Sequence, residues 1–345
     1  MKHSVKVTLI LILLFIAAQV FGLYTVNKYM EVSKDDSGNT IILYANTTVG
    51  EVPKLEENQK SYVFLPIMFM IIAMSIILLL IIKFNVGRFW KYGFFFAVAV
   101  ALSIAFGIYV NYYIAFIAAF ILALWKVFKP NPYIHNLTEV LMYAGIAVMI
   151  VPILNIISAI GLLIFISIYD AYAVWKSKHM VTLAKFQSQS KAFAGIVIPY
   201  GGKPEEVKVA KTSATPGKHV KAKKEEKKKE AKEEKKQTLT HGKPHEKEAA
   251  YENIEAQGEG LKSAILGGGD IGFTLIFCSV VMEFLIISMG VTKSLAFFYA
   301  LIPAACATIA LTFLFIFSKR GKFYPAMPPI SVGCFIGFGI VLLLV

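Results

Sequence analysis

Two aspartates of this sequence stand inside long apolar runs. Asp170 lies about six residues before Lys176, and Asp270 lies about eight residues after Lys262. At a helical rise of about 1.5 Å per residue, the two carboxylates are expected roughly 9 Å and roughly 12 Å into a membrane from the same surface. A charge at the centre of a bilayer costs roughly 2.5 kcal/mol or more, so the pair is a candidate functional site.

Two carboxylates a few Å apart have a specific chemistry, because both cannot be ionised and they share one proton. The ionised partner can take a proton from water while the protonated partner donates to a carbonyl oxygen, as in an aspartic protease. This chemistry requires no metal and no cofactor. The alternative is a proton- or cation-coupled transporter, since paired membrane acids also bind cations or relay protons. A transporter often has repeated halves and a path to both surfaces, whereas we find no repeat and both acids lie near one surface.

Three glycines directly precede the second aspartate. Gly267, Gly268 and Gly269 loosen the start of the helix and allow another backbone to approach closely, as an extended substrate strand would require. The alternative is close packing of helices through small residues.

A proline-rich segment, residues 323–330, stands at the start of the last apolar run. Pro325, Pro328 and Pro329 remove backbone donors and are expected to prevent a helix. Irregular backbone at membrane depth is tolerated against protein or a watery cavity, so the segment is a candidate wall of the site.

The composition indicates a membrane protein that crosses the bilayer several times. Its 345 residues are 57% hydrophobic and 17% charged, with a mean hydropathy of +0.64. The apolar runs are continuous and approach the roughly 20 residues of a spanning helix, so we predict an all-α polytopic protein with about nine transmembrane helices. The expected spans are Val5–Leu23, Val63–Ile82, Tyr92–Val110, Tyr112–Phe128, Leu137–Leu154, Ile156–Lys176, Ile265–Met289, Ser294–Phe317 and Pro329–Val345.

Two of these spans have alternatives. The first run follows Lys2 and Lys6 and could be a signal peptide cleaved near Ala17 and Ala18, although its length favours a retained span. The third and fourth spans come from one long apolar stretch, which we expect to turn near Gly107–Asn111.

Basic residues between the spans set the orientation, because they stay in the cytoplasm. The N-terminus is therefore predicted inside and the C-terminus outside. The net charge of +13 comes largely from such loops and one lysine-rich segment, so no nucleic-acid partner is expected. The basic residues assigned to the cytoplasmic side outside that segment are Lys2, Lys6, Lys83, Arg88, Lys91, Lys126, Lys129, Lys319, Arg320 and Lys322.

We predict three parts along the chain: an N-terminal membrane half (1–176), a hydrophilic cytoplasmic loop (177–261) and a C-terminal membrane half (262–345). Within the loop, Lys221–Gln237 has no apolar face, so we expect disorder or a solvated helix with Glu–Lys pairs. A flexible tether is the simpler interpretation, and attraction to anionic lipid is the alternative.

Three short motifs together resemble those of the presenilin and signal peptide peptidase family of intramembrane aspartyl proteases. They are similar to the family's YD, GxGD and PAL motifs, in the family's order, on the sixth, seventh and ninth expected spans. The resemblance covers essentially the whole transmembrane chain, and the single polypeptide is similar to the archaeal members. The matching residues are Tyr169 and Asp170; Gly267, Gly268, Gly269 and Asp270; and Pro325, Ala326 and Met327.

The resemblance implies hydrolysis of peptide bonds within transmembrane helices of other proteins, with Asp170 and Asp270 as the catalytic pair. Tyr169 would flank the pair, and residues 325–327 would shape the active site and contact substrate. Met327 stands where the family usually has leucine. The two side chains are similar in volume, so we expect altered preference rather than lost activity.

The resemblance also implies the protein's surroundings. Its partners would be membrane-protein substrates and the lipid bilayer, in the plasma membrane if the cell is archaeal, and no obligatory partner subunit is implied. The predicted orientation is similar to that of presenilin and opposite to that of signal peptide peptidase.

Four other polar residues receive no catalytic role. Glu283 is expected to be a polar contact in the outer leaflet, and Glu139 is expected to suit the dipole at the start of the fifth span. His135 and His179 are expected at the surface, and the absence of an HExxH motif disfavours a zinc protease.

Overall fold

The computed structural model describes residues 5–51, 53, 55–84, 87–129, 131–177, 193–199, 263–318 and 324–345. These residues belong to one compact unit, Met1–Pro199 with Ser263–Val345. Most of the predicted 177–261 loop lies outside the described residues, as do Lys2, His179, Lys319, Arg320 and Lys322.

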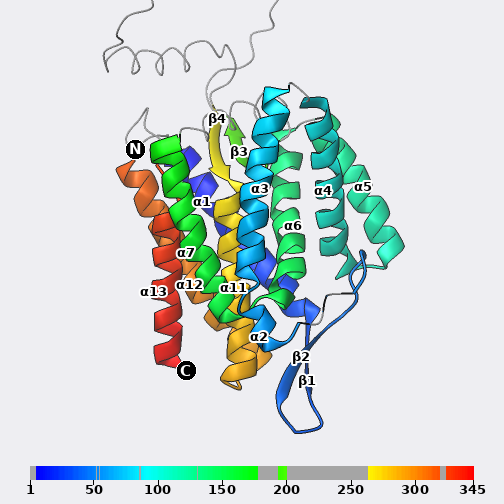
Figure 1. The fold of residues 1–345 in the computed structure, drawn as a ribbon, viewed down its shortest axis with the longest axis vertical. Coiled ribbons are helices and arrows are strands. Elements are labelled where there is room, and N and C mark those ends of the chain that lie inside the picture. The colour runs from blue at the N-terminus through cyan, green and yellow to red at the C-terminus, as the bar shows by residue number, and fades with distance from the viewer. Residues whose placement is uncertain are drawn as a thin grey trace, which may run out of the picture. The chain divides into compact units, whose positions relative to one another are not determined.

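The described part of the chain is built from apolar helices, which confirms the predicted all-α polytopic fold (Figure 1). Eight of them are long and apolar enough to cross a membrane. The ninth, α5, has 17 residues. These helices are α1 (Val5–Tyr29), α3 (Phe64–Lys83), α4 (Gly87–Gly107), α5 (Tyr112–Phe128), α6 (Pro132–Ile150), α7 (Ile156–Tyr172), α11 (Gly268–Ser288), α12 (Lys293–Phe317) and α13 (Met327–Leu344).

Shorter helical elements extend or precede some of the spans. The single turn α2 (Glu57–Lys60) precedes α3, the 3-10 turn η1 (Val151–Ile153) follows α6, and the π-helical turn η2 (Ala173–Ser177) continues α7.

Asparagines start three of the helices. The side chains of Asn111, Asn131 and Asn155 each accept a hydrogen bond from a backbone N–H in the first turn of α5, α6 and α7, which satisfies a donor that has no partner inside the helix. Asn111 lies between α4 and α5, so the long apolar stretch divides where Gly107–Asn111 predicts.

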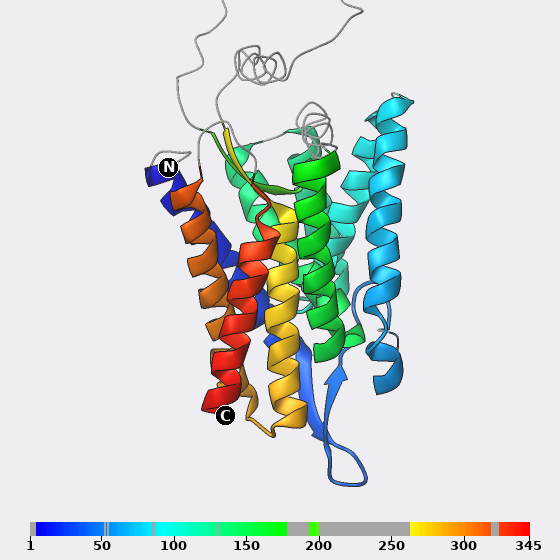
Figure 2. The ribbon, with the colours of Figure 1, turned by 60° about the vertical axis from the view of Figure 1, so that its left-hand side comes forward.

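The seventh spanning helix, α11, lies at the centre of the unit. Its most apolar window is 72% buried, compared with 6% for the stretch containing α3, and it contacts α1, α6, α7, α12 and α13. Figure 2 shows α3 at the edge of the unit, and α7, α11 and α13 side by side. The two helices that carry the aspartates are therefore held from several sides.

Glycines bring α13 against α12. A Cβ on Gly333 would lie 2.7 Å from the carbonyl oxygen of Cys306, and one on Gly337 would lie 2.3 Å from Cα of Pro303. Such close backbone packing through small residues is frequent in membrane bundles. It fixes α13, whose first residue belongs to the predicted 325–327 segment.

Two pairs of antiparallel strands complete the described fold, and each pair is called a hairpin although the strands of the second pair are far apart in sequence (Figure 1). Strands β1 (Met30–Lys34) and β2 (Thr40–Tyr44) follow α1 directly. Strands β3 (Gly195–Pro199) and β4 (Ser263–Gly267) pair with Gly195 opposite Gly267, and β4 runs straight into α11.

The second hairpin corrects a predicted boundary. The seventh helix begins at Gly268 rather than Ile265, because Ser263–Gly267 pairs with β3 as a strand. An apolar run shorter than a helical turn or two does not distinguish the end of a helix from a strand. The first helix also continues to Tyr29, beyond the predicted end at Leu23.

More of the proline-rich segment is helical than predicted. Among its described residues only Tyr324, Pro325 and Ala326 are irregular, because α13 begins at Met327 and includes Pro328 and Pro329 in its first turn. The first turn of a helix has N–H groups without helical partners, so proline is accommodated there.

Candidate active site

Two carboxylates lie at the same end of the helical unit. Asp170 lies in the last turn of α7 and Asp270 in the first turn of α11. The two helices contact each other, and the two carboxylates are close enough to interact electrostatically. Both residues are partly exposed. Two helices of opposite direction thus bring together the acids that the sequence singled out.

Asp170 is held by the segment before α13. Its Oδ2 accepts a hydrogen bond from the backbone N–H of Met327 at 3.1 Å, and the backbone of Ala326 also bonds to it. Pro325 and Met327 are buried. The predicted 325–327 segment therefore contacts the first aspartate through its backbone, and its side chains pack inside the unit.

Asp270 is held by the start of its own helix. It is the third residue of α11, and its carboxylate accepts a hydrogen bond from the backbone of Gly267, the N-cap. A side chain at this position that reaches back to the N-cap satisfies a free N–H. An acidic residue in the first turn also suits the helix dipole. The bond fixes the carboxylate at the junction of β4 and α11.

The three glycines before Asp270 have different surroundings. A Cβ on Gly268 would lie 2.6 Å from the Tyr143 hydroxyl and 3.3 Å from the Ala194 backbone, which leaves no room for a side chain. One on Gly267 would lie 3.1 Å from Asp270 Oδ2, whereas one on Gly269 would meet no atom nearer than 3.7 Å. Close backbone approach is therefore needed mainly at Gly268.

Tyr169 precedes the first aspartate but connects elsewhere. Its hydroxyl donates to Oγ of Ser75 in α3 at 2.9 Å, and its ring stacks on Phe165 with centroids 6.1 Å apart. Tyr169 thus joins α7 to α3, the helix with the least buried surface.

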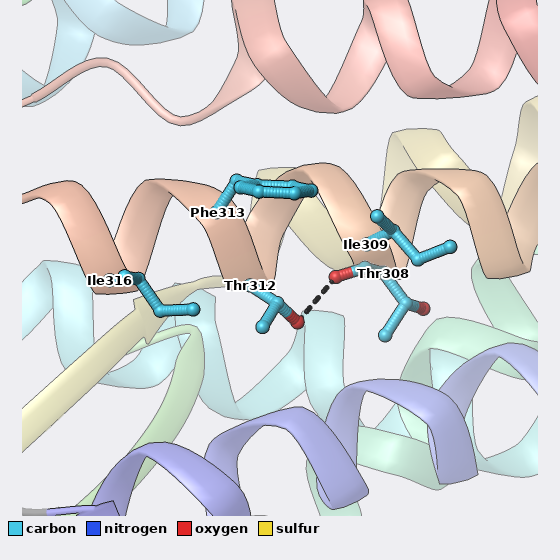
Figure 3. A pocket seen from close by; sticks show the side chains of 5 residues that line it. All are labelled: Thr308, Ile309, Thr312, Phe313 and Ile316. Atoms are coloured by element: carbon cyan, nitrogen blue, oxygen red, sulfur yellow. Dashed lines mark hydrogen bonds between the residues drawn. The ribbon is translucent and has the colours of Figure 1, made fainter.

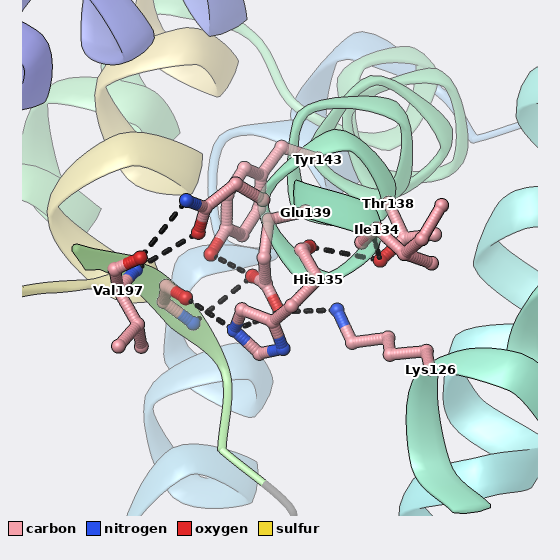
Figure 4. Close-up of polar contacts among 9 residues, drawn as sticks. Lys126, Ile134, His135, Thr138, Glu139, Tyr143 and Val197 are labelled. Carbon is pink, nitrogen blue, oxygen red and sulfur yellow. Dashed lines mark hydrogen bonds and ion pairs between the residues drawn. The ribbon is translucent and has the colours of Figure 1, made fainter. Parts of the chain in front are cut away.

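A buried polar network adjoins the hairpin (Figure 4). Lys126 Nζ of α5 lies 2.5 Å from Glu139 Oε1 of α6, and both side chains are almost fully buried. The other oxygen of Glu139 accepts from the hydroxyl of Tyr143 and from the backbone N–H of Gly195 at 3.0 Å. His135 Nε2 lies 2.8 Å from the carbonyl oxygen of Gly195, which can only accept.

This network corrects two sequence-based expectations. Because α6 begins at Pro132, Glu139 lies two turns inside the helix rather than at the dipole-favoured start. His135 is partly buried against β3 rather than free at the surface. The available signal was the four-residue spacing of His135, Glu139 and Tyr143, which places them on one helix face. The partners in α5 and β3 are distant in sequence.

Glu283 lies apart from the carboxylate pair, in the C-terminal half of α11. It is buried, and its Oε1 is 3.7 Å from Lys60 Nζ of α2. Tyr44 of β2 adjoins it as well. The residue thus joins α11 to the elements at the opposite end of the spans.

A shallow hollow on α12 has no features of a reaction site (Figure 3). Thr308, Ile309, Thr312, Phe313 and Ile316 line it, and the Thr312 hydroxyl donates to the Thr308 carbonyl at 2.8 Å within the helix. No ionisable side chain lines the hollow. Within the described ranges, no cluster of three or more His, Cys, Asp or Glu side chains could hold a metal ion.

A bundle of membrane-spanning helices with two interacting aspartates has the features of an intramembrane aspartyl protease. The chain belongs to the signal-peptide peptidase and presenilin aspartyl protease family, whose model matches residues 46–345. This match confirms the family resemblance and identifies the chain as an intramembrane peptidase. A comparison with curated proteins finds no match.

Two solved structures of similar fold are each described as a presenilin family intramembrane aspartate protease, one in a C222 and one in a P2 crystal form. The first is 14% identical, with a TM-score of 0.55, and the match covers 98% of this chain and 99% of that chain. The second is 16% identical, with a TM-score of 0.52 and 98% of each chain covered. The similarity of fold therefore extends over almost the whole length of this chain and of each solved structure.

Proposed function

We propose that this chain hydrolyses peptide bonds within transmembrane segments of other membrane proteins, with Asp170 and Asp270 as the catalytic pair. The ionised carboxylate takes a proton from water as the water oxygen attacks the substrate carbonyl carbon, and the protonated carboxyl donates to the carbonyl oxygen. When the C–N bond breaks, the leaving nitrogen takes a proton from the pair and the gem-diol returns one. The pair again shares a single proton, and no metal or cofactor takes part.

The observation that carries this proposal is that Asp170 and Asp270, on two helices that contact each other, are close enough to interact electrostatically. Each carboxylate also accepts a backbone hydrogen bond from a different segment. Fixed backbone donors keep the carboxylates oriented, and a catalytic group must be in position before reaction. Family membership supports the same chemistry.

The edge of β4 offers a place for the substrate. In the described residues β3 and β4 form a two-stranded sheet, so one edge of β4 has no strand partner, and Ile265 is 47% exposed there. A transmembrane helix must unwind before its backbone can be cut, which leaves amide groups unpaired in lipid. Pairing with β4 would satisfy them, and the strand would lie beside Asp270.

We further infer that the N-terminus and the reaction site face the cytoplasm and that the C-terminus faces outside. Lys83 is the last residue of α3, and Lys129 and Lys176 follow α5 and α7, all at the end that carries the β3–β4 hairpin (Figure 1). The β1–β2 hairpin at the other end carries Asp35 and its acidic neighbours. This asymmetry matches the preference of basic loops for the cytoplasm.

The test uses the purified chain in detergent with a single-span membrane protein tagged at both ends. Mass spectrometry of the two products should locate the cut within the transmembrane segment of the substrate. The alternative, a proton- or cation-coupled transporter, predicts that the tagged protein stays intact and that protons or cations cross the membrane of proteoliposomes containing the chain. Flux without cleavage of several substrates would reverse our choice.

A further inference from the structure

We propose that Glu139, together with Lys126, is a positioning residue that fixes the β3–β4 hairpin and so the edge of β4 beside Asp270, where we propose that the substrate pairs. This inference rests on the proposed function of Asp270. Neither residue touches the carboxylate pair in the structure; they act through β3 and Tyr143.

The outer edge of β3 is held by side chains of α6. Asn136 donates from Nδ2 to the carbonyl oxygen of Val197 and accepts from the Val197 N–H, both at 2.9 Å. Two residues earlier, the N–H of Gly195 donates to Glu139 and its carbonyl accepts from His135. The side chains of α6 thus bond β3 as a neighbouring strand would.

The inner edge of β3 pairs with β4. In an antiparallel pair, residues alternate in the direction of their backbone groups. Since Gly195 and Val197 bond to α6, the backbone groups of Ile196 and Ile198 face their register partners, Leu266 and Ala264. Both edges of β3 are therefore occupied, and β3 is a fixed template for β4.

The network also touches the junction of β4 and α11 directly. The Tyr143 hydroxyl that donates to Glu139 lies 2.6 Å from the position a Cβ of Gly268 would take. The N–H of Gly268 donates to the carbonyl of Ala194, next to Gly195, at 3.3 Å. The side chain of Tyr143 alone therefore connects Glu139 to Gly268, which is two residues before Asp270.

A role in positioning explains why an ion pair is buried here. Two charges removed from water gain little net stability, and an apolar pair of similar volume is often as stable. The carboxylate of Glu139 supplies what an apolar side chain does not, an acceptor for the backbone of β3. The acceptor oxygen is therefore the feature to vary.

Two double variants separate the acceptor from the charges. Lys126→Met with Glu139→Gln keeps an oxygen for the Gly195 N–H, whereas Lys126→Met with Glu139→Leu does not. Both remove the two buried charges and keep similar volumes. Asn136→Ala is a third variant at a partly exposed position, where folding is less at risk. Glu283→Gln is the control, because it disrupts another buried ion pair that does not contact β3.

The first measurement does not depend on activity. Val197 and Ile265 are register partners that do not exchange backbone hydrogen bonds, so their Cα atoms are expected about 4.5 Å apart, within reach of a disulfide. With Val197→Cys and Ile265→Cys in each background, the rate of bridge formation under mild oxidation is followed by mass spectrometry of non-reduced peptides. The rate should fall roughly tenfold or more in the Leu variant and in Asn136→Ala. It should stay near wild type in the Gln variant and in Glu283→Gln.

The second measurement is the kinetics of cleavage below the unfolding temperature of each variant. α11 is held by several helices, whereas β4 is held by β3, so a loosened hairpin should mainly impair substrate binding. The Leu variant should raise KM roughly tenfold with a smaller change in kcat, and the Gln variant should retain wild-type KM.

Equal bridge rates and equal KM values in the Gln and Leu variants would overturn the proposal, as would an equal loss in Glu283→Gln. If the unmodified chain cleaves no substrate, the proposed function fails, while the bridge rates still decide whether Glu139 holds the hairpin.

Discussion

Asp170 accepts a hydrogen bond from the backbone N–H of Met327 at 3.1 Å, across 157 residues of sequence. The bond joins the last turn of α7 to the first residue of α13. Because the donor belongs to the backbone, the side chain at position 327 can change in type as long as it still packs. Met327 is buried, with 3% of its surface exposed.

Met327→Leu should therefore retain activity and stability. The two side chains are similar in volume, and such exchanges usually cost less than about 1.5 kcal/mol. Met327→Ala, by contrast, should lower the unfolding free energy by about 2–5 kcal/mol and reduce cleavage, because a cavity forms beside the Asp170 donor. Thermal unfolding and cleavage rates of the two variants check this, and equal loss in both would contradict it.

The three glycines before Asp270 should respond differently to alanine. Gly268→Ala should abolish most cleavage, since its Cβ would lie 2.6 Å from the Tyr143 hydroxyl. Gly269→Ala should have little effect, and Gly267→Ala should reduce the rate by crowding the Asp270 carboxylate. Cleavage assays on the three purified proteins test the order. Loss of activity in Gly269→Ala with retention in Gly268→Ala would show that the hairpin is placed differently.

The hydroxyl of Tyr169 should matter through Ser75. Tyr169→Phe and Ser75→Ala should each cost about 1 kcal/mol of unfolding free energy, the net value of one hydrogen bond. The double variant should cost little more than either single one, because both remove the same bond. Additive losses would mean that the two residues act independently, and strong loss of cleavage in Tyr169→Phe alone would assign its hydroxyl to the reaction.

The buried pair Lys60 and Glu283 should serve stability alone. Glu283→Gln removes the buried carboxylate 3.7 Å from the Lys60 ammonium and leaves that ammonium with the exposed carboxylate of Glu57, 3.3 Å away, so the unfolding temperature should fall. Cleavage measured well below that temperature should be unchanged, because the pair lies far along α11 from Asp270. A change of kcat with unchanged unfolding temperature would contradict this assignment.

The membrane-spanning helices and the pair of aspartates could be predicted from the sequence, because both follow from residues that are near one another along the chain. Continuous apolar runs fix the helices, and counting residues from Lys176 and Lys262 puts Asp170 and Asp270 at one level. The turn between α4 and α5 follows from Asn111, a residue that caps a helix through its own side chain.

The hairpin and its support could not be predicted in the same way. Strand β3 lies between stretches of polar sequence, and its partner β4 is more than sixty residues away, so the pairing carries no local signal. Glu139 looks like an ordinary acid near a helix start until Pro132 sets the true start of α6. Its partner Lys126 looks like a topology-setting charge, although the structure buries it.

The most direct test of the account compares the unmodified chain with Asp170→Asn and Asp270→Asn, using the same tagged single-span substrate. Asparagine keeps the size of each side chain but cannot exchange the shared proton, so both variants should fold, bind substrate and cleave none of it. Cleavage that survives in either variant would contradict the assignment of these two carboxylates as the catalytic pair.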